Sequence, residues 1–118
     1  MATSETAICE RLAKVTLAKL VLLVEMNGQL IASAGDPAQL DAEQFGSLAT
    51  EHVGRLLNER ELAIGREDGR GDVLHFSRVG NRLILLVIFD ERSSPAVVQA
   101  QSRIARAELE AQSGSIEK

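Results

Sequence analysis

The sequence predicts an α/β domain of the α+β kind, in which helices cover both faces of a mainly antiparallel sheet. The first observation is a run of seven apolar residues, Leu83 to Phe89, with no polar alternation, as expected for a strand buried on both faces. The second is a shorter run of the same kind, Leu20 to Val24. The third is a pair of turn signals, Asn27-Gly28 and Gly80-Asn81, each of which places a hairpin partner beside one of these strands. We therefore expect both apolar runs near the centre of the sheet.

The overall composition limits the chain to one domain and narrows its partners. With 118 residues, the chain is long enough for a single core, so residues 1–118 are expected to form one domain. Its formal net charge of −4 argues against nonspecific attraction to nucleic acid or to an anionic membrane surface. No apolar run approaches the roughly 20 residues that a membrane-spanning helix needs. The single cysteine, Cys9, cannot form an internal disulfide, which favours a cytoplasmic protein.

A short helix is expected near the N-terminus. Apolar residues recur at helical spacing over residues 5–13, and Thr3 or Ser4 supplies a hydroxyl that can cap the first turn. Residues 15–17 either extend this helix or begin the first strand, because the β-branched residues there oppose the helical pattern.

The first hairpin follows this helix. The strand at 20–24 leads into Asn27-Gly28, a pair that favours the positive φ angles of a tight turn. Residues 29–34 are expected to form the returning strand. Gly35-Asp36-Pro37 then ends it, because proline lacks a ladder N–H and restricts the residue before it.

A second helix is predicted over residues 41–58, with Asp41 as its N-cap. Beside its apolar face, the helical period aligns Gly46, Thr50 and Gly54 in one row. Each glycine inside a helix costs about 1 kcal/mol relative to alanine, so the close approach of another backbone is expected there. Either the row packs against the chain's own sheet, or it forms an outward groove for a partner.

The second half of the chain is expected to add three strands and a last helix. Residues 61–66 form a short, weak strand, and residues 72–79 pair with the central run through a two-residue turn. The last helix has Pro95 in its first turn and runs to about Gln112, with residues 113–118 as a short flexible tail. One apolar stripe of this helix is expected to face the core: Val97, Ile104, Ala105 and Leu109.

The short strand at 61–66 is expected to lie at an edge of the sheet. An exposed edge presents unpaired backbone groups and readily pairs with another strand. Because this edge follows the helix that carries the small-residue row, we expect a symmetric dimer.

No group of residues predicts an active site. His52 on the second helix and His75 in a strand lack further ligands at metal spacing, so we expect neither to bind a metal. We interpret His52 as a partly buried, hydrogen-bonded core histidine. Cys9 has no evident histidine partner and is expected to be buried. None of the glycines is followed by lysine, so there is no Walker-type loop for a nucleotide. We therefore expect no metal, no cofactor and no enzyme activity of the chain's own.

The chain resembles the roadblock family, and within it the bacterial MglB-like proteins. The resemblance lies in residues 7–35 (AICERLAKVTLAKLVLLVEMNGQLIASAG), in residues 79–93 (VGNRLILLVIFDERS), and in the expected helix at 41–58 between them. It implies a roadblock-like three-layer α/β/α fold, whose five-stranded sheet carries one helix on one face and two on the other. It also implies dimerisation through the second helix and the third strand.

The same resemblance implies a Ras-like small GTPase of the MglA kind as partner, engaged by two protomers. Proteins like MglB accelerate GTP hydrolysis by reshaping the switch regions of the GTPase, without inserting an arginine finger. In that family a small-residue row on the second helix faces the GTPase, and the matching positions here are Gly46, Thr50 and Gly54. The implied function is a homodimeric GTPase-activating protein in bacterial cell polarity and gliding motility. The alternative is a noncatalytic roadblock scaffold that binds a GTPase or another protein and leaves hydrolysis unchanged.

Overall fold

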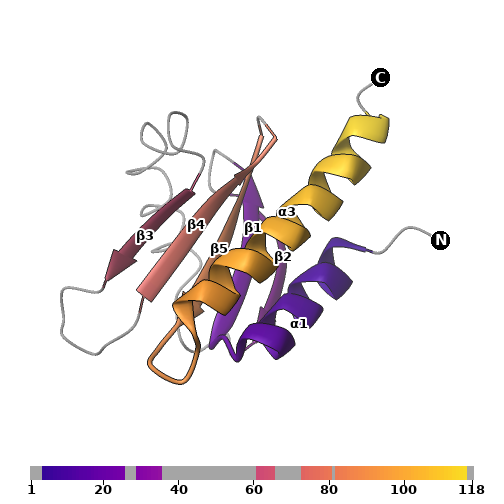
Figure 1. The fold of residues 1–118 in the computed structure, drawn as a ribbon. Coiled ribbons are helices and arrows are strands. Elements are labelled where there is room, and N and C mark those ends of the chain that lie inside the picture. Colours follow the sequence, from indigo (N-terminus) through magenta and orange to yellow (C-terminus); the bar gives the residue numbers. More distant parts are fainter. Residues whose placement is uncertain (1–3, 26–28, 36–60, 66–72, 81, 117–118) are drawn as a thin grey trace.

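The computed structural model describes residues 4–25, 29–35, 61–65, 73–80 and 82–116. These residues form strands and helices in the following order (Figure 1): α1 (Glu5–Thr16), β1 (Leu20–Glu25), β2 (Leu30–Gly35), β3 (Glu61–Gly65), β4 (Val73–Val79), β5 (Leu83–Phe89) and α3 (Pro95–Ile116). The helix expected over residues 41–58 lies outside the described residues. The elements on either side of it occur where the sequence predicts them.

The five strands form one antiparallel sheet in the order β2-β1-β5-β4-β3. The two apolar strands, β1 and β5, are neighbours, with Leu22 opposite Leu86 in the register. Each also pairs with its expected hairpin partner, β2 with β1 and β4 with β5. The expectation that both apolar runs lie inside the sheet is therefore confirmed, and β3 lies at an edge as predicted.

The side chains of the central strands alternate between two buried clusters, one on each face of the sheet. The cluster beneath the helices contains these strand residues: Val21, Leu23, Ala32, Val79, Leu85, Val87 and Phe89. The cluster on the opposite face consists of these residues: Leu20, Leu22, Val24, Leu62, Leu74, Phe76, Ile84, Leu86 and Ile88. Both faces of β5 are therefore buried, as its uninterrupted apolar sequence requires.

Helix α1 begins at a hydroxyl cap and ends in a left-handed residue. The Ser4 side chain accepts a hydrogen bond of 3.1 Å from the Ala7 backbone N–H, so Ser4 rather than Thr3 is the N-cap. The helix continues to Thr16, whose Oγ1 donates to the Leu12 carbonyl at 2.6 Å. The residues at 15–16 therefore extend the helix, and Leu17 with φ of 57° turns the chain toward β1.

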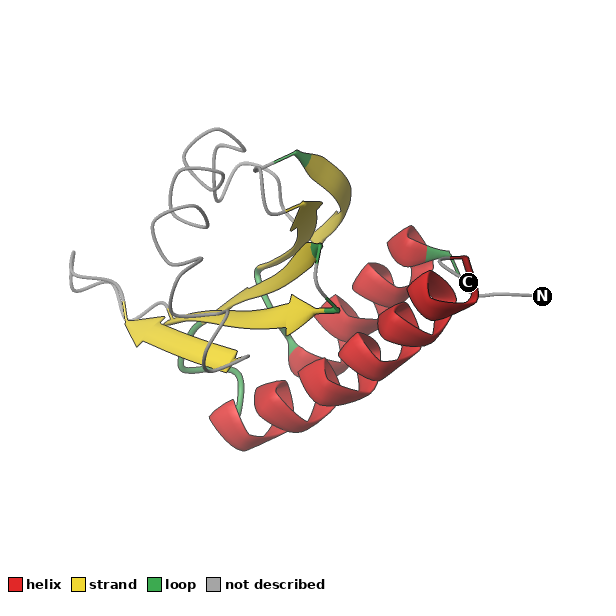
Figure 2. Ribbon diagram, turned by 90° about the horizontal axis from the view of Figure 1, so that it is seen from above, coloured by secondary structure: helices red, strands yellow, loops and turns green. Residues whose placement is uncertain are grey.

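Helices α1 and α3 lie side by side on one face of the sheet (Figure 2). Ile8, Cys9 and Leu12 of α1 are buried against this face together with Val98 and Leu109 of α3. Arg11 of α1 pairs with Glu108 of α3, and Ser93, just before α3, donates from its Oγ to the carbonyl of Leu17, just after α1, at 3.1 Å.

Helix α3 differs from the expectation in its rotation and in its length. Val97 and Ile104 are 42% and 48% exposed, so the predicted stripe is wrong at these two positions. The buried stripe is Val98, Ser102, Ala105 and Leu109. The two stripes are adjacent on the helix surface, and packing on the sheet selects the one that carries Ser102. The helix also continues to Ile116, about one turn beyond its expected end, into the segment interpreted as a tail.

Candidate partner-binding surface

Strand β3 provides an open edge of the sheet. It pairs with β4 on one side, with Leu62 opposite Phe76, and no strand among the described residues pairs with its other side. Leu62 points into the cluster on the face opposite the helices and is 7% exposed, whereas Ala63 is exposed. An edge of this kind presents backbone donors and acceptors to a second strand.

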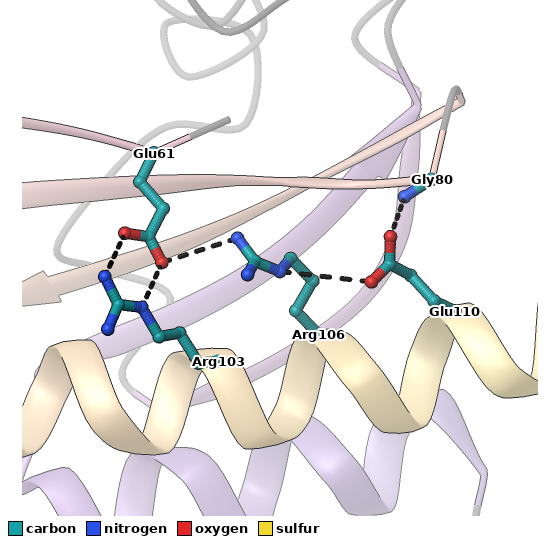
Figure 3. A network of polar contacts seen from close by, with 5 residues as sticks. All are labelled: Glu61, Gly80, Arg103, Arg106 and Glu110. Atoms are coloured by element: carbon teal, nitrogen blue, oxygen red, sulfur yellow. Dashed lines mark hydrogen bonds and ion pairs between the residues drawn. The ribbon is translucent and has the colours of Figure 1, made fainter. Parts of the chain in front are cut away.

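Glu61, the first residue of β3, connects this edge to α3 through two arginines (Figure 3). Arg103 Nε donates to Glu61 Oε1 at 2.9 Å, and its Nη2 donates to Oε2 at 3.1 Å. This two-bond geometry fixes the orientation of the carboxylate as well as its position. Arg106 Nη1 lies 3.4 Å from the same Oε1 atom, so one carboxylate bridges two successive turns of the helix.

The contacts continue from Arg106 to the connection between β4 and β5. Arg106 Nε lies 3.9 Å from Glu110 Oε1 in an ion pair along the helix. The other carboxylate oxygen of Glu110 accepts a 3.0 Å hydrogen bond from the backbone N–H of Gly80. Gly80 has a positive φ of 59° and follows directly after β4. One chain of polar contacts therefore links the edge strand, the helix and the turn into the central strand.

The charges of this network follow from its geometry. The hydrogen bond from Arg103 is the main cause that lowers the pKa of Glu61, with a smaller contribution from the charge of Arg106. Burial is the main cause that lowers the pKa of the neighbouring His75; the negative charge of Glu61 opposes this shift, and the positive charges of the two arginines add to it. At neutral pH the network therefore contains a charged Glu61 beside a neutral His75.

A polar layer lies beneath this network, where α3 packs on β4. His75, Ser77 and Ser102 are at most 6% exposed. Neither Nδ1 of His75 nor the Oγ of either serine has a hydrogen-bond partner within the part of the chain that the structure describes. The contact of α3 with this half of the sheet is therefore less apolar than its contact with α1 and with the central strands, where Val98 and Leu109 lie.

The residues singled out from the sequence have different outcomes. The small-residue row, Gly46, Thr50 and Gly54, lies outside the described residues, so its partner-binding role stays a prediction. His52 lies outside them as well, and its interpretation as a core histidine also stays a prediction. His75 lies in a strand as predicted and is buried there. Cys9 is also buried, and burial is the main cause that raises the pKa of its thiol to about 12, so at neutral pH it is a protonated thiol and a poor nucleophile.

The ion-pair network is the feature that sequence reasoning missed. Arg103, Arg106 and Glu110 recur at i, i+3 and i+7 on α3, a spacing that places them on one helix face. Glu61, the partner of the two arginines, lies 42 residues before Arg103, and no local pattern connects this glutamate with the helix. Among the described residues, no three His, Cys, Asp or Glu side chains come together as metal ligands. None of the described helices is long and apolar enough to cross a membrane.

Comparisons with known proteins identify the class to which this fold belongs. No protein-family model matches the chain, and no curated protein matches it. Among solved structures, MglB from Myxococcus xanthus is 34% identical, with a TM-score of 0.82 over 96% of this chain and 97% of that one. A gliding protein MglB from Thermus thermophilus is 20% identical, with a TM-score of 0.71 over 94% of this chain and 92% of that one. A Roadblock/LC7 domain from Streptomyces avermitilis is 16% identical, with a TM-score of 0.74 over 91% of this chain and 95% of that one.

The five-stranded antiparallel sheet with two described helices is thus an α+β fold of the roadblock type. The two more distant structures share this fold with the chain at 20% identity or less. The similarity to the Myxococcus protein extends to the sequence over nearly the whole of both chains. The chain belongs to the roadblock family and is MglB-like.

Proposed function

We propose that this chain is a cytoplasmic, homodimeric regulator that binds a Ras-like small GTPase of the MglA kind and stimulates its GTP hydrolysis. The observation that carries this proposal is the 34% identity to Myxococcus MglB over 96% of the chain. We also propose a role in bacterial cell polarity and gliding motility; the gliding part is supported by the Thermus structure, which is described as a gliding protein. The regulator contributes no arginine finger in this proposal; it acts on the conformation of the GTPase.

The proposed contact with the GTPase is the small-residue row Gly46, Thr50 and Gly54. Small side chains allow the backbone of a partner to approach a helix closely, which offsets the cost of two glycines in its interior. The proposed dimer contact is the open edge of β3, the next described element along the chain. Two copies joined at this edge would form one continuous sheet, and the dimer would carry two small-residue rows, one from each copy.

The decisive experiment is single-turnover GTP hydrolysis by the MglA-like GTPase encoded near this gene, with and without this protein. We expect acceleration of at least about tenfold, which corresponds to about 1.4 kcal/mol of barrier. Binding without acceleration would replace the proposal with the noncatalytic scaffold. Absence of GTPase binding at micromolar concentrations would contradict the proposal and would leave only a scaffold that binds another protein.

Gly54→Arg tests the contact surface within the same assay. An arginine in the small-residue row would block close approach, so we expect loss of GTPase binding while the circular dichroism spectrum and the melting temperature stay near those of the wild type. Val97→Arg is the matched control, because it adds the same side chain at an exposed position of α3. If Gly54→Arg binds as tightly as Val97→Arg, the row is not the contact surface.

A further inference from the structure

Within the described part of the chain, strand β3 has few attachments to other elements. It is five residues long and pairs with one strand, β4, among the described residues. Leu62 anchors its face away from the helices, while Ala63 on the helix side is exposed. Short edge strands open more easily than central ones, because a single row of ladder hydrogen bonds holds them. The position of β3 therefore depends on side-chain contacts in addition to its hydrogen bonds with β4.

Among the described side chains, Glu61 attaches β3 to α3. Its side chain is 18% exposed, and that of Arg106 is 17% exposed, so this pair is screened less by solvent than an ion pair at the surface. Arg103 is 55% exposed but binds the carboxylate through two hydrogen bonds. Both arginines come from one helix, so the carboxylate cannot move without disturbing two successive turns of α3.

At its other end, the network is attached to the turn after β4 through Glu110. Arg106 pairs with Glu110, and Glu110 binds the Gly80 N–H at the end of β4 (Figure 3). The edge strand is thus connected, through α3, to the turn that leads into the central strand β5. A displacement of β3 would have to break these contacts or carry α3 with it.

The polar layer between α3 and β4 increases the importance of this network. Apolar contacts would hold the helix to the sheet without charges, but on this half of the sheet His75, Ser77 and Ser102 are also buried, with side-chain atoms that lack hydrogen-bond partners in the described part of the chain. Buried polar groups contribute less to such a contact than apolar side chains of similar size. On this half of the sheet, the ion pairs therefore supply a larger share of the attachment than they do near α1.

We propose that Glu61, Arg103 and Arg106 form a brace that positions the open edge of β3 for pairing with a second copy of the chain. The brace consists of these three residues, and they are positioning residues that act through the backbone of β3. The inference rests on the dimer of the proposed function and adds what controls its strength. The Glu61 side chain lies on the sheet face that α3 covers. The brace therefore leaves the backbone N–H and C=O groups on the edge of β3 away from β4 available to the partner strand.

The test compares Glu61→Gln and Arg103→Gln with a matched pair of variants, Arg11→Gln and Glu108→Gln. The control pair also ties a neighbouring element to α3 through one ion pair, but it involves α1 and leaves β3 untouched. Sedimentation equilibrium gives the dimer dissociation constant, and hydrogen exchange gives the opening of the β3 amides. We expect Glu61→Gln to raise the dissociation constant about tenfold and to speed exchange in β3, while the control variants change neither.

A double-mutant cycle and a salt titration separate positioning from general weakening of the fold. The effects of Glu61→Gln and Arg103→Gln should be smaller in combination than their sum, because both remove the same contact. Raising the salt concentration should weaken the wild-type dimer more than the Glu61→Gln dimer, because salt screens the brace in the wild type alone. Circular dichroism should show the same helix and strand content for all four variants.

The outcomes distinguish this proposal from the function on which it rests. A wild-type chain that is a monomer at all concentrations would overturn the proposed dimer, and the brace proposal with it. A wild-type dimer whose Glu61→Gln variant dissociates at the same concentration would overturn the brace proposal alone and leave the dimer standing.

Discussion

At the scale of single residues, neighbouring ionisable groups are shifted by different causes. Hydrogen bonding to Arg103 lowers the pKa of Glu61 and favours its charged form, whereas burial lowers the pKa of His75 and favours its neutral form. Both shifts depend on contacts between β3, β4 and α3. The residue types at these positions do not predict them, because an isolated histidine or glutamate would titrate near its ordinary pKa.

His75 should make the stability of the fold depend on pH. Its pKa in the folded chain lies below the ordinary value of 6.5, so the unfolded chain binds the proton more readily. The contribution of His75 to the free energy of unfolding is therefore complete above about pH 6.5 and is lost as the pH falls toward the pKa of the folded state. We expect His75→Gln to flatten this decline in urea titrations between about pH 7 and pH 5.

Glu61 provides a comparison for this measurement, because it titrates in a lower pH range than His75. The lowered pKa of Glu61 affects stability in a different window, below its ordinary value of 4.5, where its contribution is lost as the pH falls. Glu61→Gln should therefore retain the decline below pH 6.5 and extend it to lower pH, because the charge of Glu61 raises the pKa of His75 and its removal lowers that pKa further. If His75→Gln loses stability as steeply as the wild type, another group is responsible for the decline.

At the scale of elements, two glycines with positive φ have different roles at strand ends. Gly35 ends β2 with φ of 106°, and a Cβ there would lie 2.5 Å from the Lys19 carbonyl oxygen and 2.9 Å from Leu20 Cα. Gly80 follows β4 with φ of 59°, and a Cβ there would meet nothing within 4 Å. The end of β2 thus requires a glycine for space as well as for conformation, whereas the turn after β4 requires it for conformation alone.

We expect Gly35→Ala to destabilise the fold by about 2 kcal/mol or more, because backbone atoms of the neighbouring strand would have to move. Gly80→Ala is the matched control and should cost about 1 kcal/mol, the penalty of a left-handed alanine without a clash. Chemical denaturation of the two variants measures both values. Equal losses would show that the close approach at Gly35 is relieved at little cost.

Helix α3 shows how packing selects one of several acceptable helix faces. The stripe with Val97 and Ile104 is more apolar than the stripe with Ser102, yet the latter faces the sheet. With Ser102 and Ala105 inward, the side chains next to the sheet are small, and Arg106 and Glu110 come within reach of Glu61 and Gly80. Hydrophobic periodicity alone could not detect this arrangement, because it does not record the shape of the opposing sheet.

At the scale of the whole molecule, the sheet ends in β2 on one side and β3 on the other. Strand β2 exposes Leu30 and Ile31 and shifts register near the Leu23–Val24 step of β1, an irregularity that disfavours continued pairing at an edge. Strand β3 pairs with β4 in one uninterrupted register. Of the two edges, β3 is therefore the better template for a second strand.

We expect light scattering to give the mass of a dimer at micromolar concentrations. Ile31→Lys should leave that mass unchanged, because it places a charge at the β2 edge, away from the proposed contact. A concentration-independent monomer would contradict the dimer. Dissociation caused by Ile31→Lys would move the contact from β3 to β2.

The sequence by itself determined the strands, their hairpin pairing and the burial of β1 and β5 on both faces, because apolar runs and turn residues act over a few neighbouring positions. It also placed β3 at an edge and narrowed the cap of the first helix to Thr3 or Ser4, of which the structure selects Ser4. Only the tertiary structure decided which face of α3 is buried and that Glu61 meets Arg103. The same holds for the left-handed Leu17, whose carbonyl accepts a hydrogen bond from Ser93, 76 residues away. Contacts of this kind depend on strand order and on helix rotation, which are settled by packing of the whole chain rather than by local sequence.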